Sequence, residues 1–462
     1  MLRKPCFALT GLALAALTPL ALAQTVTVGP NINVTRQAGS QSETAIAISR
    51  TNTNLVTISA NSSSALVNKY STDGGSTWNN SSLSVAGGYD SWMGADSFGN
   101  IYLSYQVSGV TSIARSTNGG ATYGLNVTIA GGGADHPEMG VGPGVVAGTT
   151  SVFLRDTVAS NSRVISATSS GLGSTSAFTT QTGQGAGNFG STAVGPGGRT
   201  IFTTMNPAGG VGPTNMALRY DADGTGPGGY VLQNTIATNV GGFRLIPAQP
   251  SRSIDAQVQL AYDFSGGARN GNLYMVYTQA ATTTTNDTNI VFRRSTDNGA
   301  SFSSEVRLNT DAGTNSQFFG RLAVDQATGY LASVWYDARN SASNTAAELW
   351  GTVSADGGTT WVPNFKISAG ISDGRSTNTG DPNEFGDYIS LDFYAGNLVT
   401  AWADSSNSTG DNPNGTSGLD IYYARALVAA VVPEPSTWLL MSLGLVVGLR
   451  RVQKAKAQRQ AA

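Results

Sequence analysis

An eight-residue motif recurs four times along this chain of 462 residues, and its recurrence constrains the fold more than any other feature. The copies read STDGGSTW, STNGGATY, STDNGASF and SADGGTTW, and they span residues 71–78, 116–123, 295–302 and 354–361. Each has a Ser, an Asp or Asn two positions later, a glycine and a closing aromatic residue. A motif repeated through a chain of this length predicts one architecture of equivalent units, because unrelated domains would not share it.

The residues of this motif suit a tight turn after a β-strand. Each copy follows a run with β character, such as residues 290–294, IVFRR. The Asp or Asn side chain accepts backbone N–H bonds, and glycine allows a positive φ. The aromatic ring is expected to fold back into its own sheet, where its burial contributes roughly 1.5–3 kcal/mol. We therefore interpret the following residues as structural and not catalytic: Asp73, Trp78, Asn118, Tyr123, Asp297, Phe302, Asp356 and Trp361.

A second repeat consists of short apolar strands that are preceded by turns rich in Gly or Asn. Their spacing of about 45 to 60 residues suits a unit of four strands joined by variable connections. One period throughout argues against separate β-sandwiches, and a solenoid would have shorter, more regular repeats. Seven such strands occur, at residues 55–58, 101–105, 152–154, 201–203, 273–277, 331–335 and 398–402.

The four turns resemble the Asp boxes, or BNR repeats, of sialidase-like β-propellers. This resemblance implies an all-β fold, and we predict a single β-propeller of four-stranded blades over residues 25–430. The strand count favours seven blades over six, although sialidases themselves have six. The last unit ends at residues 421–425 without a turn motif. The apolar segment 26–28 is predicted to supply its outer strand and close the ring.

The N-terminus reads as a signal peptide over residues 1–23. Arg3 and Lys4 precede an apolar run, and Ala21 and Ala23 frame a small-residue cleavage site before Gln24. The only cysteine, Cys6, lies inside this segment. The exported protein is therefore predicted to fold without disulfides.

The C-terminus, residues 432–462, resembles a PEP-CTERM sorting signal. Pro433, Glu434 and Pro435 precede an apolar stretch at residues 438–449 and then a basic tail. As a helix this stretch is about 18 Å long, short of the ~30 Å hydrocarbon core, so a permanent anchor helix is the weaker alternative. The resemblance implies an exosortase as partner, a membrane-held C-terminal segment before processing, and delivery to the outer surface or extracellular matrix of a Gram-negative-type bacterium.

The charge of the chain excludes one class of partner. The formal net charge is −2, and it becomes more negative once the basic ends are removed. A nucleic-acid-binding protein shows a basic patch or stripe instead. We therefore expect no nucleic-acid partner.

Catalysis of the sialidase kind is weakly supported. The resemblance implies three arginines that bind a carboxylate, and a Tyr–Glu pair that acts as nucleophile. The family's Phe/Tyr-Arg-Ile-Pro element belongs before the first Asp box, but the similar string at residues 243–247 has one extra residue and follows two of the turns. We expect no converging arginine trio. The weak candidates are Arg244, Arg321 and Arg339, with Tyr388 and Glu384 as the pair.

The single histidine, His136, has two interpretations. It is either a general base oriented by Asp135 or Glu138, or a structural residue at the start of a strand. Equivalent places in other units hold the segments 90–93 and 318–320, which points to a repeated strand entry and favours the structural interpretation. With one histidine, a site of several histidines around a metal is excluded.

Polar residues stand before the first strand of each unit, where a propeller chain approaches its axis. If they converge, they form an acidic mouth suited to Ca²⁺ or to sugar hydroxyls, and no other cofactor is implied. The alternative is that they cap turns. These residues are Glu43, Asp90, Asp135, Asn188, Asp255, Gln317 and Asp387.

Together these features predict an exported surface or matrix propeller that binds glycans or protein partners without catalysis. The alternatives are an exported glycoside hydrolase related to exo-sialidases and a purely structural envelope component. Neither the ligand nor the functional face follows from the residues.

Overall fold

The computed structural model describes residues 24–207, 209–224, 229–430 and 458–459. Gln24–Ala429 form one compact body. The predicted signal peptide and the triplet Pro433–Pro435 lie outside the described residues, so the structure tests neither prediction. Within the described ranges, no helix is long and apolar enough to span a bilayer.

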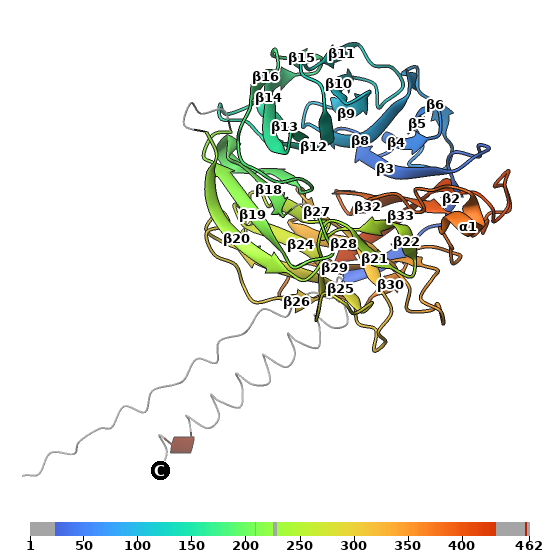
Figure 1. The fold of residues 1–462 in the computed structure, drawn as a ribbon. Helices are drawn as coiled ribbons and strands as arrows, with labels where there is room; N and C mark the ends of the chain where they lie inside the picture. Colours follow the sequence, from blue (N-terminus) through green and yellow to red (C-terminus); the bar gives the residue numbers. More distant parts are fainter. Residues whose placement is uncertain (1–23, 208, 225–228, 431–457, 460–462) are drawn as a thin grey trace, which may run out of the picture. The chain divides into compact units, whose positions relative to one another are not determined.

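The body is a ring of seven antiparallel sheets (Figure 1), which confirms the all-β propeller fold and the count of seven. Each sheet begins with an inner strand. Every inner strand contacts the next, and the last contacts the first, so the circle is closed. The inner strands are β3 (Gln41–Ile48), β8 (Gly88–Ala95), β12 (Ala134–Pro143), β17 (Thr192–Val194), β23 (Gln259–Tyr262), β27 (Gln317–Asp325) and β31 (Ser390–Tyr394).

The seven apolar runs of the sequence lie in the second strands, apart from Leu55, which precedes β4, and these strands are buried between neighbours on both sides. They are β4 (Val56–Ser62), β9 (Ile101–Val107), β13 (Thr150–Val158), β18 (Thr200–Asn206), β24 (Leu273–Ala280), β28 (Tyr330–Asp337) and β32 (Asn397–Asp404). The third strands are β5 (Ala65–Ser71), β10 (Val110–Ser116), β14 (Asn161–Gly171), β19 (Thr214–Asp221), β25 (Thr288–Ser295), β29 (Glu348–Ser354) and β33 (Asp420–Ala430).

Most of the outer strands are short, and β20 (Val231–Thr238) is the longest of them. They are β6 (Asn79–Asn80) with β7 (Val85–Ala86), β11 (Leu125–Thr128), β15 (Ser174–Thr175) with β16 (Thr179–Gln181), β20, β26 (Val306–Arg307) and β30 (Phe365–Lys366). Outside the ring, β21 (Arg244–Ile246) and β22 (Gln249–Ile254) form a separate hairpin between the fourth and fifth sheets.

The N-terminal strand closes the ring, as predicted. β1 (Gln24–Val28) pairs with β33 and becomes the outer strand of the seventh sheet, and β2 (Ile32–Asn33) also pairs with β33. Val26 and Val28 pack against the core, whereas Thr25 and Thr27 are exposed. This alternation is the pattern of a strand that buries one face.

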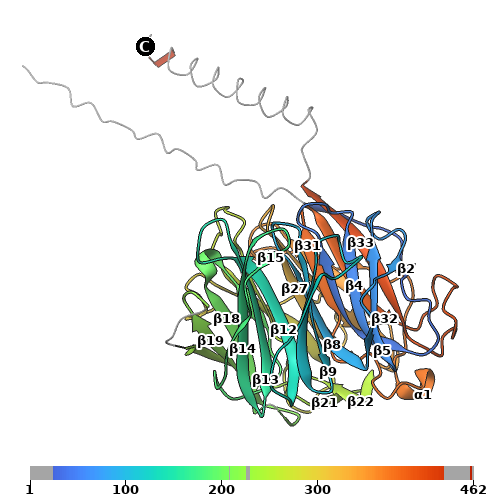
Figure 2. The same ribbon diagram turned by 90° about the horizontal axis from the view of Figure 1, so that it is seen from above.

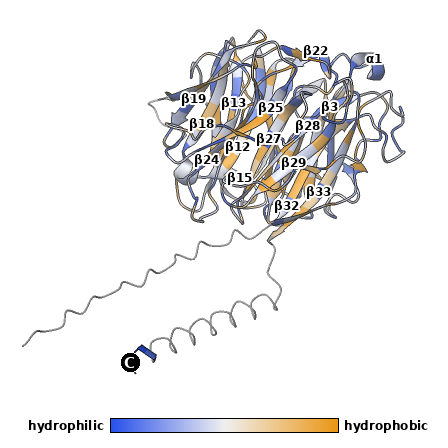
Figure 3. Ribbon diagram, turned by 90° about the horizontal axis from the view of Figure 1, so that it is seen from below, coloured by the Kyte–Doolittle hydropathy of each residue, from blue (hydrophilic) through white to orange (hydrophobic). Residues whose placement is uncertain are grey.

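Apolar side chains fill the space between the sheets. Figure 3 shows hydrophobic residues along the strands and polar residues in the loops. Two of the largest buried side chains repeat one arrangement: the indole N–H of Trp335 donates to Asp337, and that of Trp402 donates to Asp404, each at 2.8 Å. A buried indole needs such a partner, so these carboxylates belong to the packing of the core.

The four repeated turns share one set of hydrogen bonds. In each, the Ser Oγ accepts from the backbone N–H four residues on, at 2.8–2.9 Å. The Asp or Asn Oδ1 likewise accepts from the backbone N–H four residues on, also at 2.8–2.9 Å. The turn is therefore closed by its own side chains.

The aromatic residue of two of these turns contacts the preceding sheet, in addition to the predicted position against its own sheet. The Trp78 ring lies 5.1 Å from that of Tyr423 on β33, and the Trp361 ring lies 5.1 Å from that of Phe292 on β25. At Gly75, with φ of 97°, an added Cβ would stand 2.1 Å from the Tyr423 ring. The close approach of neighbouring sheets explains both the contact and the glycine.

Strand direction separates two faces of the ring. Because strands alternate, the inner strands begin at one face, and the third strands end at the other. The four repeated turns follow third strands and therefore lie opposite the starts of the inner strands. β22 and the one-turn helix α1 (Ser376–Thr379) lie together at one end of the body in Figures 2 and 3.

Candidate functional site

The inner strands share an irregularity near their first residues. In six of the seven sheets a non-glycine residue there has φ between 44° and 55°. The pairing with the second strand shifts around this position in at least four sheets. Such a backbone is strained for these residue types, and strain of this kind clusters at binding and catalytic sites. The residues are Glu43, Asp90, His136, Phe189, Gln257 and Phe319.

A cavity of about 280 Å³, here called the mouth cavity, lies at these strand starts. The structure brings five of the seven predicted mouth residues to its lining: Asp90, Asp135, Asn188, Asp255 and Asp387. The hairpin β21–β22 borders the same cavity through Arg252 and Ser253. These five predicted residues therefore converge, and the inserted hairpin β21–β22 lines part of the same cavity.

The other two predicted mouth residues are placed differently. Glu43 is buried and reaches the site through Arg252, whose Nη2 is 3.4 Å from Glu43 Oε1. Gln317 is bonded away from the mouth cavity, donating to Asp337 at 3.2 Å and accepting from Asn309 at 2.7 Å. Gln317 thus fits the alternative of a residue that stabilises loops.

One wall of the mouth cavity is aromatic. The Phe243 ring lies 5.7 Å from that of Phe189, which lies 4.9 Å from the His136 ring. Behind them, Trp92 lies 6.2 Å from His136 and 4.2 Å from Tyr388. Phe243 is 55% exposed. An exposed ring beside carboxylates is a surface on which the apolar face of a sugar can stack.

Burial divides the carboxyl groups of the mouth cavity into two kinds. It raises the pKa of Asp90 to about 6 and that of Asp255 to about 7, against the opposing effect of His136. Burial acts on Asp135 as well, but His136 and a 2.9 Å hydrogen bond from Asn188 outweigh it and hold the pKa of Asp135 below its usual value. Near neutral pH the mouth cavity therefore offers both protonated and ionised carboxyl groups.

His136 is held within this acidic group. Burial lowers the pKa of His136, but Asp135, Asp90 and Asp387 together outweigh it and raise that pKa. Its Nε2 lies 3.8 Å from Asp135 Oδ2. The neighbouring carboxylates thus favour the protonated form of His136, and its ring also packs against Phe189 and Trp92.

No metal centre can be defined at this site. The described residues contain no group of three or more His, Cys, Asp or Glu side chains placed to hold a metal ion. Asp387 is paired with Arg252, and Asp255 accepts a hydrogen bond from the backbone of Gln257. Calcium binding stays a prediction for which no ligand set can be named.

The residues suggested for sialidase chemistry have separate surroundings. Arg244 donates to backbone carbonyls of the loop at Thr282 and Thr285. Arg339 pairs with Asp337 at 2.6 Å and lies 4.1 Å above the Trp350 ring. Each of these arginines already has its partners.

The suggested Tyr–Glu pair is likewise divided. The Tyr388 hydroxyl is 3.5 Å from the backbone oxygen of Ser91, and Glu384 accepts from the backbone N–H groups of Ser251 and Arg252. Of the five candidates, only Arg321 and Tyr388 are in contact, with the guanidinium 5.3 Å from the ring centre.

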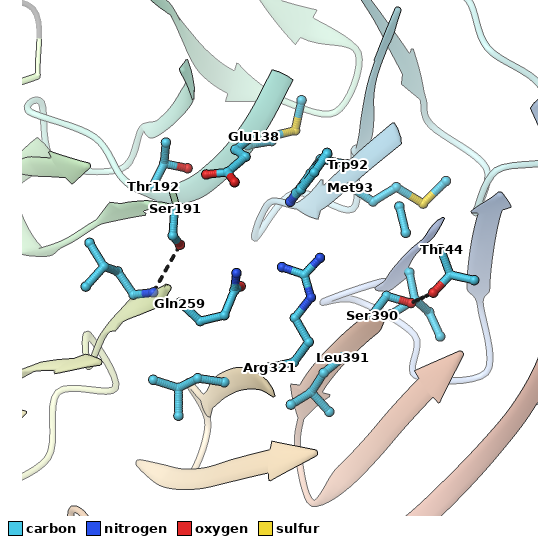
Figure 4. Close-up of a pocket in the computed structure, with 15 residues that line it drawn as sticks. Thr44, Trp92, Met93, Glu138, Ser191, Thr192, Gln259, Arg321, Ser390 and Leu391 are labelled. Carbon is cyan, nitrogen blue, oxygen red and sulfur yellow. Dashed lines mark hydrogen bonds between the residues drawn. The ribbon is translucent and has the colours of Figure 1, made fainter. Parts of the chain in front are cut away.

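A second cavity of about 150 Å³, the axial channel, is lined further along the inner strands (Figure 4). Trp92, Glu138, Gln259 and Arg321 contribute side chains to it. Burial raises the pKa of Glu138 to about 8 and lowers that of Arg321 to about 10. Glu138 and Arg321 are ionisable side chains, and such side chains are rarely buried unless they are paired.

Sequence reasoning missed several residues of the site. Arg252 and Phe243 belong to the inserted hairpin, which has no counterpart in the other units, so no repeat alignment could reveal them. Phe189 occupies the same register as His136 and Asp90, and this alignment was the one available signal for it.

A comparison with protein families adds the sorting signal. The model of the PEP-CTERM protein-sorting motif matches residues 431–452. No curated protein matches this chain in sequence. The chain is thus a seven-bladed β-propeller with a C-terminal sorting motif. This motif marks it as a surface protein processed by an exosortase and exported to the cell envelope of Gram-negative bacteria.

Three solved structures that resemble the chain are remote from it in sequence. A Hadza microbial sialidase is 11% identical, with 83% of this chain and 75% of that chain covered and a TM-score of 0.44. A polysaccharide lyase is 12% identical, with 84% and 89% covered and a TM-score of 0.47. An α-L-arabinofuranosidase of Fusarium graminearum is 12% identical, with 71% and 98% covered and a TM-score of 0.43. The activities in these names belong to those proteins.

Proposed function

We propose that this protein is a surface-displayed, non-catalytic carbohydrate-binding propeller that holds a glycan in the mouth cavity. The observation that carries the proposal is the pairing of surfaces in that cavity: the rings of Phe243 and Phe189 border a space also lined by Asp135, Asp255 and Asp387. Aromatic rings stack on sugar faces, and carboxyl groups bind sugar hydroxyls.

The contacts around the mouth cavity support binding rather than turnover. Asp387 is paired with Arg252, and Asp135 is held by Asn188. Tyr388 and Glu384 have separate partners. Side chains that are held by such bonds are suited to binding a ligand without cleaving it.

A glycan array with purified residues 24–432 tests this function. We expect binding that Phe243→Ala weakens about fivefold or more, since stacking and apolar contact on an aromatic ring contribute roughly 1–3 kcal/mol. Leu245→Ala is the matched control, because Leu245 is 54% exposed on the same hairpin but does not line the cavity. Equal loss in both variants, or binding unchanged by Phe243→Ala, would contradict the proposal.

A glycoside hydrolase is the second candidate, favoured by one observation. Asp255, whose pKa burial raises to about 7, and Asp135, whose pKa is lowered, line the same cavity. Such a pair can serve as general acid and base. Turnover of a fluorogenic glycoside that Asp255→Asn abolishes would establish this activity and replace the binding proposal.

A further inference from the structure

The axial channel and the mouth cavity are lined by neighbouring positions of the same inner strands. On β8, Asp90 lines the mouth cavity and Trp92 the channel, and on β12, His136 and Glu138 divide in the same way. Figure 4 shows Glu138, Gln259 and Arg321 extending into one space from three strands. On β8 and β12, the groups that line the two cavities are therefore two residues apart on the same strand.

Polar atoms in this channel lack hydrogen-bond partners. Glu138 is 2% exposed, and its Oε2 accepts no hydrogen bond in the described part of the chain. Thr192, also buried, has an unpaired Oγ1. Leaving such an atom unpaired costs about 1–3 kcal/mol, so buried orphans that line a cavity indicate a polar ligand.

Arg321 adds unpaired donors to the same space. It is 6% exposed, and its one hydrogen bond runs from Nε to the backbone oxygen of Ile389. Its two terminal nitrogens have no hydrogen-bond partner among the described residues. The guanidinium is held by Trp92 and Tyr388, whose ring centres lie 5.7 and 5.3 Å away. This places a rigid fork of donors in the channel.

Arg321 and Glu138 require different atoms from a ligand. Arg321 only donates, so it needs an acceptor. Because burial raises the pKa of Glu138 to about 8, its carboxyl is largely protonated at neutral pH, so its O–H can donate to a ligand while its carbonyl oxygen still needs a donor. A carboxylate ligand supplies acceptors alone. An amide supplies an acceptor and an N–H donor in one plane, and its alkyl group can pack on Trp92.

We propose that the axial channel recognises a carboxamide group, whose C=O accepts from Arg321 and whose N–H donates to Glu138. The proposal rests on the proposed glycan-binding function in one respect: there the group is the acetamido substituent of an N-acetylated sugar whose ring lies in the mouth cavity. A channel of about 150 Å³ has room for a small substituent, since one water needs ~10–15 Å³.

Calorimetric titration of purified residues 24–432 with two sugars tests this assignment. The methyl glycosides of N-acetylglucosamine and of glucose differ in the acetamido group alone. We expect the acetylated sugar to bind at least about tenfold more tightly, because it satisfies buried groups that the other leaves unpaired. Equal binding of both sugars overturns the channel assignment while leaving glycan binding intact.

Variants connect this preference to the two residues. Glu138→Met removes the acceptor and is expected to reduce the preference to less than twofold, whereas Glu138→Gln keeps a carbonyl oxygen and retains most of it. Arg321→Lys keeps the charge but loses the fork, and we expect a partial loss. The exposed Arg36→Met is the control that leaves the preference unchanged. Melting temperatures establish that each variant is folded, and a preference unaffected by Glu138→Met overturns the assignment.

Free acetamide and acetate separate the channel from the sugar site. We expect acetamide, detected by saturation-transfer NMR, to bind the wild type and to lose binding in Glu138→Met, even if no glycan binds. That result would support the channel while the glycan proposal fails. Stronger binding of acetate, or binding of neither molecule, would mean a carboxylate site or a water-filled channel and would overturn the assignment.

Discussion

The guanidinium of Arg252 on β22 is paired with the carboxylate of Asp387, which precedes the inner strand of the closing sheet; Nε lies 2.8 Å from Oδ1, and Nη2 contacts Oδ2. The pair fastens the inserted hairpin to a distant sheet at the mouth cavity. The backbone N–H of Arg252 also donates to Glu384. The hairpin is thus held from both its main chain and its side chain.

Loss of this pair should loosen the hairpin more than it weakens the fold. For Arg252→Met we expect a stability loss below about 1 kcal/mol, because the arginine is partly exposed. Hydrogen exchange of residues 244–254 should rise several-fold, since the side-chain attachment is gone. Arg307→Met, which removes a 3.0 Å surface pair with Asp311, is the control and should leave that segment unchanged. Unaltered exchange in Arg252→Met would show that the pair does not hold the hairpin.

A second prediction concerns the repeated turns. Asp73 accepts from the Thr77 backbone at 2.9 Å and from its hydroxyl at 2.6 Å. Asp73→Ala leaves these donors to water and should cost about 1–2 kcal/mol in the free energy of unfolding. Asp73→Asn should cost less than about 0.5 kcal/mol, because Asn118 makes the same backbone bond in the second turn. Urea titrations measure both, and equal losses would remove the side-chain acceptor from the explanation.

The fold could be predicted from the sequence because its determinants are local and repeated. The turn motif fixes the end of a third strand, and the apolar runs mark the second strands, which bury both faces. Val26 and Val28 could be assigned to the closing sheet because the last unit lacked an outer strand. A ring leaves few other arrangements for such units.

The candidate site was only partly predictable, for a physical reason. Asp90, Asp135 and Asp255 could be placed near the axis from their position close to the starts of the inner strands, although Asp90 and Asp135 lie within β8 and β12 and not before them. Arg252 and Phe243 come from an insertion, and where an insertion folds depends on contacts such as that with Asp387. The unpaired state of Glu138 depends on its neighbours in space and leaves no trace in the sequence.

The free energy of unfolding should fall as the pH rises, because buried carboxyl groups have raised pKa values in the folded protein. Burial raises the pKa of Asp255 to about 7, whereas in the unfolded chain it is about 3.9. Between these values the folded protein binds the extra proton, so the stabilisation is complete below pH ~4 and is lost as the pH rises through ~7. Asp90, raised to about 6, acts in the same direction, as does His136.

Urea titrations at pH 5 and pH 8 measure this dependence. The wild type should be less stable at pH 8, and Asp255→Asn should show a shallower decline, by at most about 1.4 kcal/mol per pH unit. Asp287→Asn is the control, because Asp287 lies in a loop outside both cavities. A wild-type stability that stays level or rises from pH 5 to pH 8 would contradict the assignment of raised pKa values.

Closure of the ring by β1 gives the last prediction, because the two faces of that strand provide their own control. Val26 and Val28 pack against the core beside β33, whereas Thr25 and Thr27 face solvent. Val26→Lys or Val28→Lys places a charge against apolar side chains. Each should lower the free energy of unfolding by about 2–4 kcal/mol or detach β1 from the sheet. Thr25→Lys and Thr27→Lys should change the stability by less than about 0.5 kcal/mol. Thermal melting and limited proteolysis after residue 30 measure both effects, and similar losses on the two faces would mean that β1 is not packed as the outer strand of the seventh sheet.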